Sequence, residues 1–222
     1  MEEHIVKVRS IRSVTHDVLR FVVDRPSRYA YVPGQATEVA INKKEWREER
    51  RPFTFTSLPD EEHLEFTIKT YPSRNGVTNA LRQLRPNDEL LLHDVWGAIS
   101  YKGEGIFIAG GAGVTPFIAI IRDLDSKKQI GNNVLVFANK TRADIIDEPD
   151  FRRILGNRFI NILSDEKVNG YAHGMINEEF LKGNISNSKQ QFYVCGPPPM
   201  MDAVLGQLKN LGVGENAITV EI

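Results

Sequence analysis

The spacing of hydrophobic and polar positions divides the chain into two stretches with different periods. From Ile5 to about Ser100, short apolar or alternating runs are separated by turn residues, which is typical of antiparallel strands. One helical run, Thr78 to Leu84, interrupts them. This stretch predicts a six-stranded antiparallel β-barrel. Its expected strands are Ile5–Val8, Val18–Val23, Thr37–Ile41, Phe53–Thr56, Leu64–Thr70 and Glu89–His93.

After Trp96-Gly97 the pattern changes to strands that alternate with helices, which predicts an α/β domain with a parallel sheet. We place the two domains at residues 1–100 and 101–222. The expected strands are Gly105–Ala109, Val134–Ala138, Phe159–Leu163, Gln191–Cys195 and Ile218–Ile222. The expected helices begin at Pro116 and at Pro149, run from Asn177 to Leu181 with Gly183 as the terminator, and run from Pro199 to Leu211 before Gly212.

Composition narrows the classes of function. The 222 residues carry a formal net charge of -1, so no global field favours nucleic acid or an anionic membrane as a partner. A single cysteine, Cys195, excludes an internal disulfide and an iron–sulfur cluster held by four thiolates of this chain. The five histidines lack metal-site spacing, so we expect no metal. Without a signal-peptide pattern or a long apolar run, the sequence predicts a cytoplasmic protein.

A glycine-rich turn carries the first chemical signal. In Gly110-Gly111-Ala112-Gly113-Val114-Thr115-Pro116, the glycines let the backbone approach an anion. Thr115 is placed to cap the following helix, and Pro116 suits its first position. The turn departs from the G-x-G-x-x-G fingerprint because Pro116 stands at the third glycine, and no acid follows the second strand in Asn139–Arg142. These departures argue against an ordinary dinucleotide-dependent dehydrogenase.

Three further segments complete a pattern that resembles the ferredoxin-NADP reductase family. Arg51-Pro52-Phe53-Thr54 is similar to its flavin motif, and Gly76-Val77-Thr78 to its flavin-phosphate turn. Cys195-Gly196-Pro197-Pro198-Pro199-Met200 is similar to its nicotinamide motif. The resemblance covers essentially the whole chain. It implies an FAD-binding Greek-key barrel followed by an NAD(P)-binding α/β domain.

The resemblance assigns flavin contacts to the first domain. Arg51 would donate to the flavin diphosphate, and Phe53 would lie against the flavin, where much of the family has tyrosine. Thr54 would place its hydroxyl near flavin N5, which makes it a catalytic candidate. The N–H groups of Gly76–Thr78 would bind the flavin phosphates, and Lys69 would add a backbone contact.

The second domain would hold the nicotinamide nucleotide at the Gly110–Pro116 turn and the Cys195–Met200 motif. Cys195 would position the nicotinamide, since direct hydride transfer needs no nucleophile. Lys140 and Arg142, after the second strand, would accept a 2'-phosphate and so favour NADPH over NADH; the effect of Ser164-Asp165 stays open. The chain ends at Glu221-Ile222 without the aromatic that covers the flavin in many members. Glu221 would either reach N5 or pair at the surface.

The sequence thus predicts an NAD(P)H reductase with one FAD, which passes electrons to flavodoxin, ferredoxin or an oxygenase component. Two alternatives stay open: an NAD(P)H reductase of free flavins, and a flavin-binding electron-transfer subunit that works only in a larger complex. The mixed-charge segment Lys43–Arg50 is expected to be a solvated loop at the barrel rim. Its alternative role is to dock a partner or cover the adenine.

Overall fold

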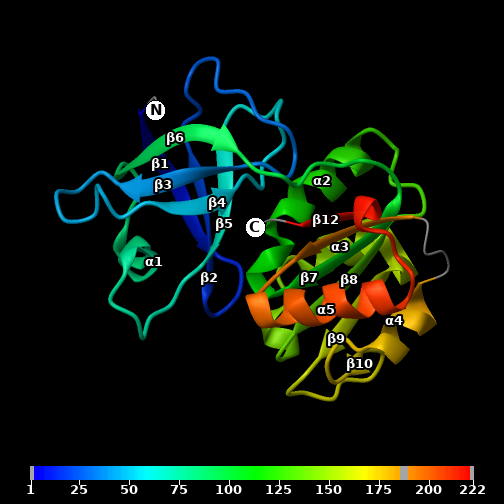
Figure 1. The fold of residues 1–222 in the computed structure, drawn as a ribbon. Helices are drawn as coiled ribbons and strands as arrows, with labels where there is room; N and C mark the ends of the chain where they lie inside the picture. Colours follow the sequence, from blue (N-terminus) through cyan, green and yellow to red (C-terminus); the bar gives the residue numbers. More distant parts are fainter. Residues whose placement is uncertain (1–2, 186–189, 221–222) are drawn as a thin grey trace. The chain divides into compact units, whose positions relative to one another are not determined.

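The computed structural model describes residues 3–185 and 190–220, and the chain forms two compact units (Figure 1). The first contains residues up to 100 together with 115–123. The second contains residues 101–114 and those from 124 onward. Each unit has its own six-stranded sheet. Along the described chain, no helix is long and apolar enough to cross a bilayer.

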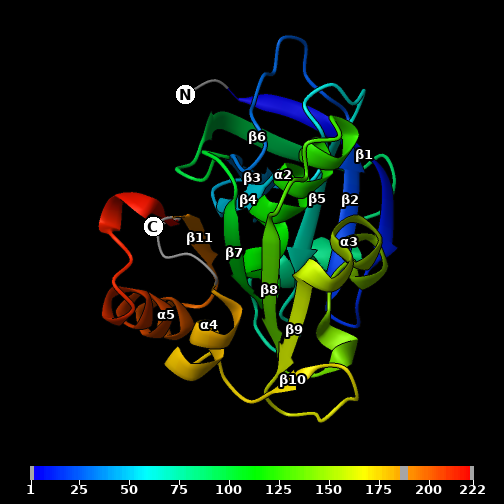
Figure 2. The same cartoon turned by 90° about the vertical axis from the view of Figure 1, so that its right-hand side faces the viewer.

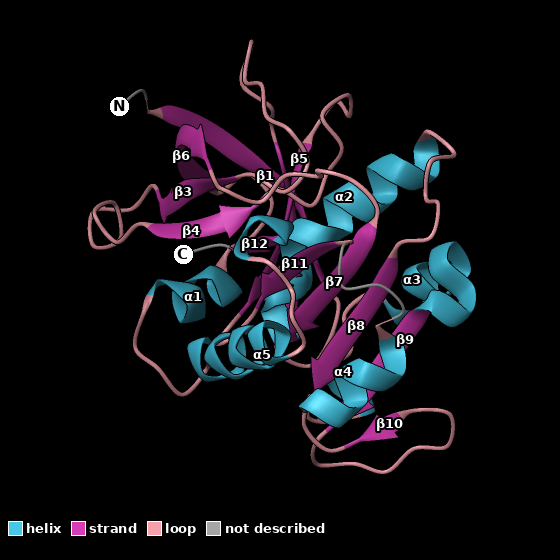
Figure 3. Cartoon of the chain, turned by 45° about the vertical axis from the view of Figure 1, so that its right-hand side comes forward, coloured by secondary structure: helices cyan, strands magenta, loops and turns pink. Residues whose placement is uncertain are grey.

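An antiparallel sheet with the order β4-β3-β6-β1-β2-β5 forms the first unit. An antiparallel bridge between Phe55 and Phe66 links the ends of this order, so the sheet closes into a Greek-key barrel (Figure 3). The fold class predicted from the sequence is confirmed for this part. The strands are β1 (His4–Ser13), β2 (Val18–Val23), β3 (Ala36–Ile41), β4 (Arg51–Thr54), β5 (Leu64–Lys69) and β6 (Glu89–Trp96).

Aromatic side chains fill the barrel and anchor the segment between β2 and β3. The ring of Tyr31 stacks on Phe55 at 4.2 Å, and Phe66 lies 5.2 Å from Phe55. Tyr29 donates its hydroxyl to Thr37 Oγ1 at 3.0 Å, so this buried phenol keeps a polar partner. Burial raises the pKa of both tyrosines to about 12. These contacts hold the segment between β2 and β3 against the barrel core, next to the end of β4.

The helical run expected at Thr78–Leu84 is split. Helix α1 (Val77–Ala80) continues directly into the 3-10 helix η1 (Leu81–Gln83). Leu81 and Leu84 are both buried in the barrel core, as their spacing indicates. The 3-10 helix η1 is wound more tightly than an α-helix, and Leu84, which follows it, reaches the core.

The second unit has a parallel sheet with the order β10-β9-β8-β7-β11-β12 (Figure 2). Leu181 and Val204 pack against one face of this sheet, and Phe151 packs against Phe137 on the other. Helices therefore cover both faces, which confirms the predicted α/β class. The strands are β7 (Gly105–Gly110), β8 (Val134–Asn139), β9 (Phe159–Leu163), β10 (Ala172–His173), β11 (Gln191–Cys195) and β12 (Ile218–Val220). The helices of this unit are α3 (Glu148–Leu155), α4 (Glu178–Asn184) and α5 (Pro198–Asn210), with 3-10 helices η2 (Gly111–Val114), η3 (Arg142–Asp144), η4 (Gly156–Arg158) and η5 (Glu215–Ala217). Helix α2 (Thr115–Ser126) follows η2, and its residues up to 123 are counted with the first unit.

Two local expectations were wrong. Gly183 does not end its helix, because α4 continues through it to Asn184 and the backbone N–H of Ile185 still bonds to Leu181. Thr115 does not precede α2 as a cap: the 3-10 helix η2 runs directly into α2, so Thr115 and Pro116 are its first two residues. Glu221 and Ile222 lie outside the described residues.

Candidate functional site

The glycine turn and the Cys195–Met200 motif form one packed element of the second unit. A Cβ on Gly113 would lie 2.3 Å from the carbonyl oxygen of Cys195, which no real side chain permits. A Cβ on Gly110 would lie 2.3 Å from the sulfur of Met200. Gly111 has a φ of +52°, and a Cβ there would meet nothing within 4 Å. Two of the glycines therefore allow the motifs to touch, and Gly111 leaves open space beside the backbone.

Both motifs lie at the carboxyl edge of the parallel sheet. Cys195 is the last residue of β11 and pairs with Ala109 of β7, and Gly110 ends β7. Helix α5 then begins after Pro197, with no acidic residue in its first turn and no side-chain cap. Because helix N-termini and this sheet edge favour anions, the geometry suits a phosphorylated nucleotide.

Asn139, at the end of the neighbouring strand β8, has a polar side chain without a partner. Its amide nitrogen and oxygen are both covered, and neither makes a hydrogen bond within residues 3–185 and 190–220. A covered amide normally has a partner, since leaving it without one costs roughly 1–3 kcal/mol. This orphaned amide at the carboxyl edge fits a ligand contact, and the glycine pattern gave no hint of it.

Lys140 and Arg142 follow β8, as the sequence indicates, but they differ in availability. Lys140 is exposed and makes no ion pair within the described part of the chain. The Arg142 guanidinium lies 3.4 Å from Glu148 Oε2 and over the Tyr171 ring at 5.7 Å. The backbone N–H of Arg142 donates to Glu166 Oε2 at 2.7 Å. Arg142 is thus already engaged by two carboxylates.

Glu148 is the centre of this network. Its carboxylate accepts from Arg152 at 2.9 Å and from the Tyr171 hydroxyl. Burial opposes ionisation of Glu148, but Tyr171, Arg152 and Arg142 outweigh it and lower its pKa. Burial and the same carboxylate raise the pKa of Tyr171. The network holds a negative charge beside Arg142 at neutral pH.

In the barrel, β4 presents the candidate flavin residues. Arg51 is exposed; its guanidinium contacts Glu49 at 3.0 Å and the Arg50 carbonyl at 2.6 Å. Phe53 is half-buried against the barrel core, and Pro52 is exposed. Thr54, which ends β4, is only 8% exposed. An anion can reach Arg51 by replacing one flexible carboxylate.

The Gly76–Thr78 turn begins α1, where a Cβ on Gly76 would meet nothing within 4 Å. No acidic side chain lies in the first turn of α1, and no side chain caps it. These features fit flavin phosphates, which would take the N–H groups of Val77 and Thr78. The Lys69 ammonium is held by Asp17 at 2.8 Å, which leaves only its backbone for the expected contact.

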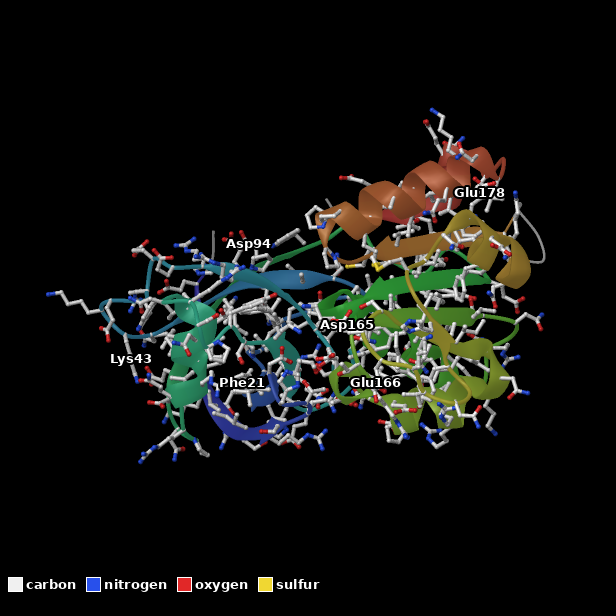
Figure 4. All side chains as sticks on the ribbon, turned by 90° about the horizontal axis from the view of Figure 1, so that it is seen from below. Phe21, Lys43, Asp94, Asp165, Glu166 and Glu178 are labelled. Atoms are coloured by element: carbon white, nitrogen blue, oxygen red, sulfur yellow. The ribbon has the colours of Figure 1, made fainter. Side chains whose placement is uncertain are left out.

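The Lys43–Arg50 segment is a loop, but it is not fully solvated. Trp46 packs against the barrel core, and Arg47 contacts Asn42 at 2.6 Å and pairs with Glu3. The outer residues of the loop, such as Lys43 (labelled in Figure 4), are exposed. The loop is therefore anchored in its middle.

Comparison with known proteins assigns both units. Residues 4–94 match the FAD-binding domain family, and residues 107–205 match the oxidoreductase NAD-binding domain family. The chain is 30% identical to NADH-cytochrome b5 reductase 2-A of Vanderwaltozyma polyspora, over 91% of this chain and 74% of that protein. The chain belongs to the ferredoxin reductase-like family. It therefore carries an FAD-binding and an NAD-binding domain.

Other members of the ferredoxin reductase-like family agree with this assignment. The ferredoxin–NAD(P)(+) reductase component of the naphthalene 1,2-dioxygenase system of Pseudomonas putida is 23% identical, over 95% of this chain and 66% of that protein. A ferredoxin NADP+ reductase from Neisseria gonorrhoeae with bound FAD and NADP has the same fold, with a TM-score of 0.85 at 17% identity, over 100% of this chain and 98% of that chain. The chain spans 48–66% of the length of six of the relatives that it matches.

Proposed function

We propose that this protein is a flavin-dependent NAD(P)H reductase. The carrying observation is that one chain matches an FAD-binding domain over residues 4–94 and an oxidoreductase NAD-binding domain over residues 107–205. Residues 1–100 bind FAD in this proposal, and residues 101–222 bind the nicotinamide nucleotide. FAD supplies a group that accepts hydride and then releases electrons singly.

The barrel residues bind and orient the flavin. Arg51 neutralises the diphosphate with charge-assisted hydrogen bonds, for which its exposed guanidinium is suited. Pro52 and Phe53 shape the surface against which the flavin lies. Thr54 holds a hydrogen bond at the N5 edge. Gly76, Val77, Thr78 and the Lys69 backbone complete the phosphate contacts.

Residues of the predicted NAD(P)-binding domain, 101–222, place the nucleotide. Gly110, Gly111, Gly113 and Val114, with Thr115 and Pro116, form the turn along which the pyrophosphate lies. Cys195, Gly196, Pro197 and Met200 orient the nicotinamide, and Cys195 positions it without covalent chemistry. Lys140 and Arg142 line the ribose end. Glu221 stays a prediction, since it lies outside the described residues.

The acceptor is a redox protein or an oxygenase component. Support comes from relatives named as the reductase component of naphthalene 1,2-dioxygenase and of propane 2-monooxygenase. A cytoplasmic location is part of the same proposal.

Anaerobic titration of the FAD-loaded protein tests the proposal. NADH or NADPH should bleach the oxidised flavin absorbance at one equivalent, and a candidate acceptor should restore it. Rapid loss of flavin together with turnover of added riboflavin or FMN would favour the free-flavin reductase. If neither nucleotide bleaches the bound flavin, the proposed function is wrong.

A further inference from the structure

His93 lies on β6 between two carboxylates that come from the strands on either side. The residue before it, Leu92, pairs with the residue after Glu3 in β1 and with the residue after Glu38 in β3. Leu92 belongs to the barrel core, so His93, next along the strand, faces the outside of the barrel. Side chains at such cross-strand positions lie close enough to interact. The register therefore places one histidine between Glu3 and Glu38.

The ring of His93 is buried, yet it has no polar partner. It is 2% exposed, and neither ring nitrogen makes a hydrogen bond within residues 3–185 and 190–220. Buried polar groups normally have a partner. Burial, followed by the nearby Arg50, lowers the pKa of His93, whereas Glu3, Glu38 and Asp94 act in the opposite direction. The ring is thus neutral at neutral pH and is surrounded by charges that would respond to a proton on it.

The loop between β3 and β4 is tied to the barrel through the same two carboxylates (Figure 1). Arg47 pairs with Glu3, and the Arg50 guanidinium lies 3.9 Å from Glu38 Oε2. These four side chains are 29–42% exposed. Ion pairs that are open to solvent hold a loop only weakly. Trp46, in the middle of the loop, adds apolar packing against the barrel core.

A proton on His93 would change which cations hold the two carboxylates. The imidazolium is attached to a strand and buried, so solvent and salt screen its attraction for Glu3 and Glu38 less than that of the exposed guanidiniums. Both ring nitrogens would become donors, and the carboxylates would supply the acceptors that they lack. The new positive charge would also repel Arg50. All three effects favour release of the loop arginines.

We propose that His93 is an acid-sensitive latch for the loop between β3 and β4. Its protonated ring takes the two carboxylates from the loop arginines, and packing of Trp46 is then left to hold the middle of the loop. Because the released form binds the proton more readily, acid shifts the equilibrium toward it. The loop leads directly into Arg51, so the latch lies beside the flavin motif. This regulation goes beyond the proposed reductase activity, since neither nucleotide nor acceptor takes part in it.

Fluorine NMR of Trp46 in the FAD-loaded protein tests the latch. The chain has two tryptophans, so Trp96→Phe in protein labelled with 5-fluorotryptophan leaves a single signal. Lowering the pH from about 7.5 to about 5 should move this signal toward its position in the unfolded protein, with a midpoint below about 6.5. A signal that stays in place, or that moves only together with global unfolding seen by circular dichroism, would overturn the inference.

Three variants identify the group that titrates. His93→Gln cannot take up the proton, so its Trp46 signal should keep the neutral-pH position throughout; the same movement as in the parent would overturn the inference. Arg50→Gln removes one loop ion pair and the cation that opposes the imidazolium, so its midpoint should move to higher pH. An unchanged or lower midpoint would contradict the latch even if His93→Gln failed to fold. His16→Gln, an exposed histidine of the same unit, is the matched control and should titrate like the parent.

Discussion

Arg51 in the barrel and Arg142 in the α/β unit look alike in the sequence, since both are expected to contact a phosphate. Their surroundings differ. Arg51 pairs with Glu49 two residues away, and both side chains are about half exposed, at 47% and 51%. Arg142 is itself 59% exposed, but it pairs with Glu148, whose side chain is 15% exposed and is also held by Arg152.

This difference affects how easily each arginine's carboxylate partner is displaced by a ligand. A solvent-exposed pair contributes about 0–1 kcal/mol, so a diphosphate can replace Glu49 at small cost. A carboxylate inside a network of several donors is harder to remove, because each donor would lose a charge-assisted hydrogen bond. The partner of an arginine near a predicted phosphate site therefore affects how readily that arginine binds a phosphate.

The largest expected effect is on flavin affinity. Arg51→Ala should weaken FAD binding by about 10- to 100-fold, because it removes charge-assisted hydrogen bonds of roughly 1.5–3 kcal/mol. Fluorescence titration of the apoprotein with FAD measures the change. Arg50→Ala, next along the chain and paired with Glu38 at 3.9 Å, is the control and should change FAD affinity little. An Arg51→Ala protein with parental affinity would show that this arginine only pairs at the surface.

In the α/β unit, Gly113→Ala should destabilise the fold by about 1–3 kcal/mol. The added methyl group would lie 2.3 Å from a backbone oxygen that cannot turn aside. Gly214→Ala is the control, because a Cβ there meets nothing within 4 Å and its φ is -72°. Urea denaturation followed by circular dichroism measures both. Equal stability of the two variants would contradict the packing role of Gly113.

The sequence predicts the architecture well because the spacing of hydrophobic residues in each strand and helix shows directly which face is buried. Phe159–Leu163 and Gln191–Cys195 are strands with the expected bounds, since continuous apolar runs mark strands buried on both faces. The prediction that Gly183 ends its helix was wrong. A glycine that ends a helix usually adopts a left-handed conformation, and Gly183 has no positive φ. Gly212, with a φ of +78°, does follow its helix.

The site is only partly readable from the sequence. The four motifs show where the cofactors are expected to bind, because each motif is a short segment whose local turn can be predicted from neighbouring residues. The sequence favoured NADPH because Arg142 was interpreted as a phosphate ligand. That interpretation did not take into account Glu148 and Tyr171, which contact Arg142 in the structure. Tyr171 is 23 positions from Glu148, and their contact arises from tertiary packing. Asn139 was also missed, because a lone asparagine at a strand end gives no signal before its burial is known.

The network around Arg142 also predicts a pH effect on stability. Because the pKa of Glu148 is lowered in the folded state, its contribution is present above the unfolded value of 4.5 and is lost as pH falls through the folded value. Glu148→Gln should lower the free energy of unfolding at pH 7 by about 1 kcal/mol, and the difference from the parent should vanish in acid. Urea titrations at several pH values measure it. A difference that does not depend on pH would rule out the ionised carboxylate as its source.

The smallest expected effect is on the stability of the barrel, which, like that of the α/β unit, should decrease as pH falls. His93 is 2% exposed, and neither ring nitrogen has a partner within the described residues. Burial, followed by the nearby Arg50, lowers its pKa, although Glu3, Glu38 and Asp94 act in the opposite direction. The unfolded chain therefore binds a proton more readily than the folded one, so the stability of the parent should decrease as pH falls below about 6.5.

His93→Gln should remove this loss between about pH 6.5 and the lower folded pKa, and should leave the carboxylate-dependent loss at more acidic pH. NMR titration of the imidazole signal in the parent gives the folded pKa independently. A folded pKa at or above the unfolded value would show that the three carboxylates outweigh burial. The charge balance of the barrel wall would then resemble that around Arg142, where burial is also outweighed by opposite charges.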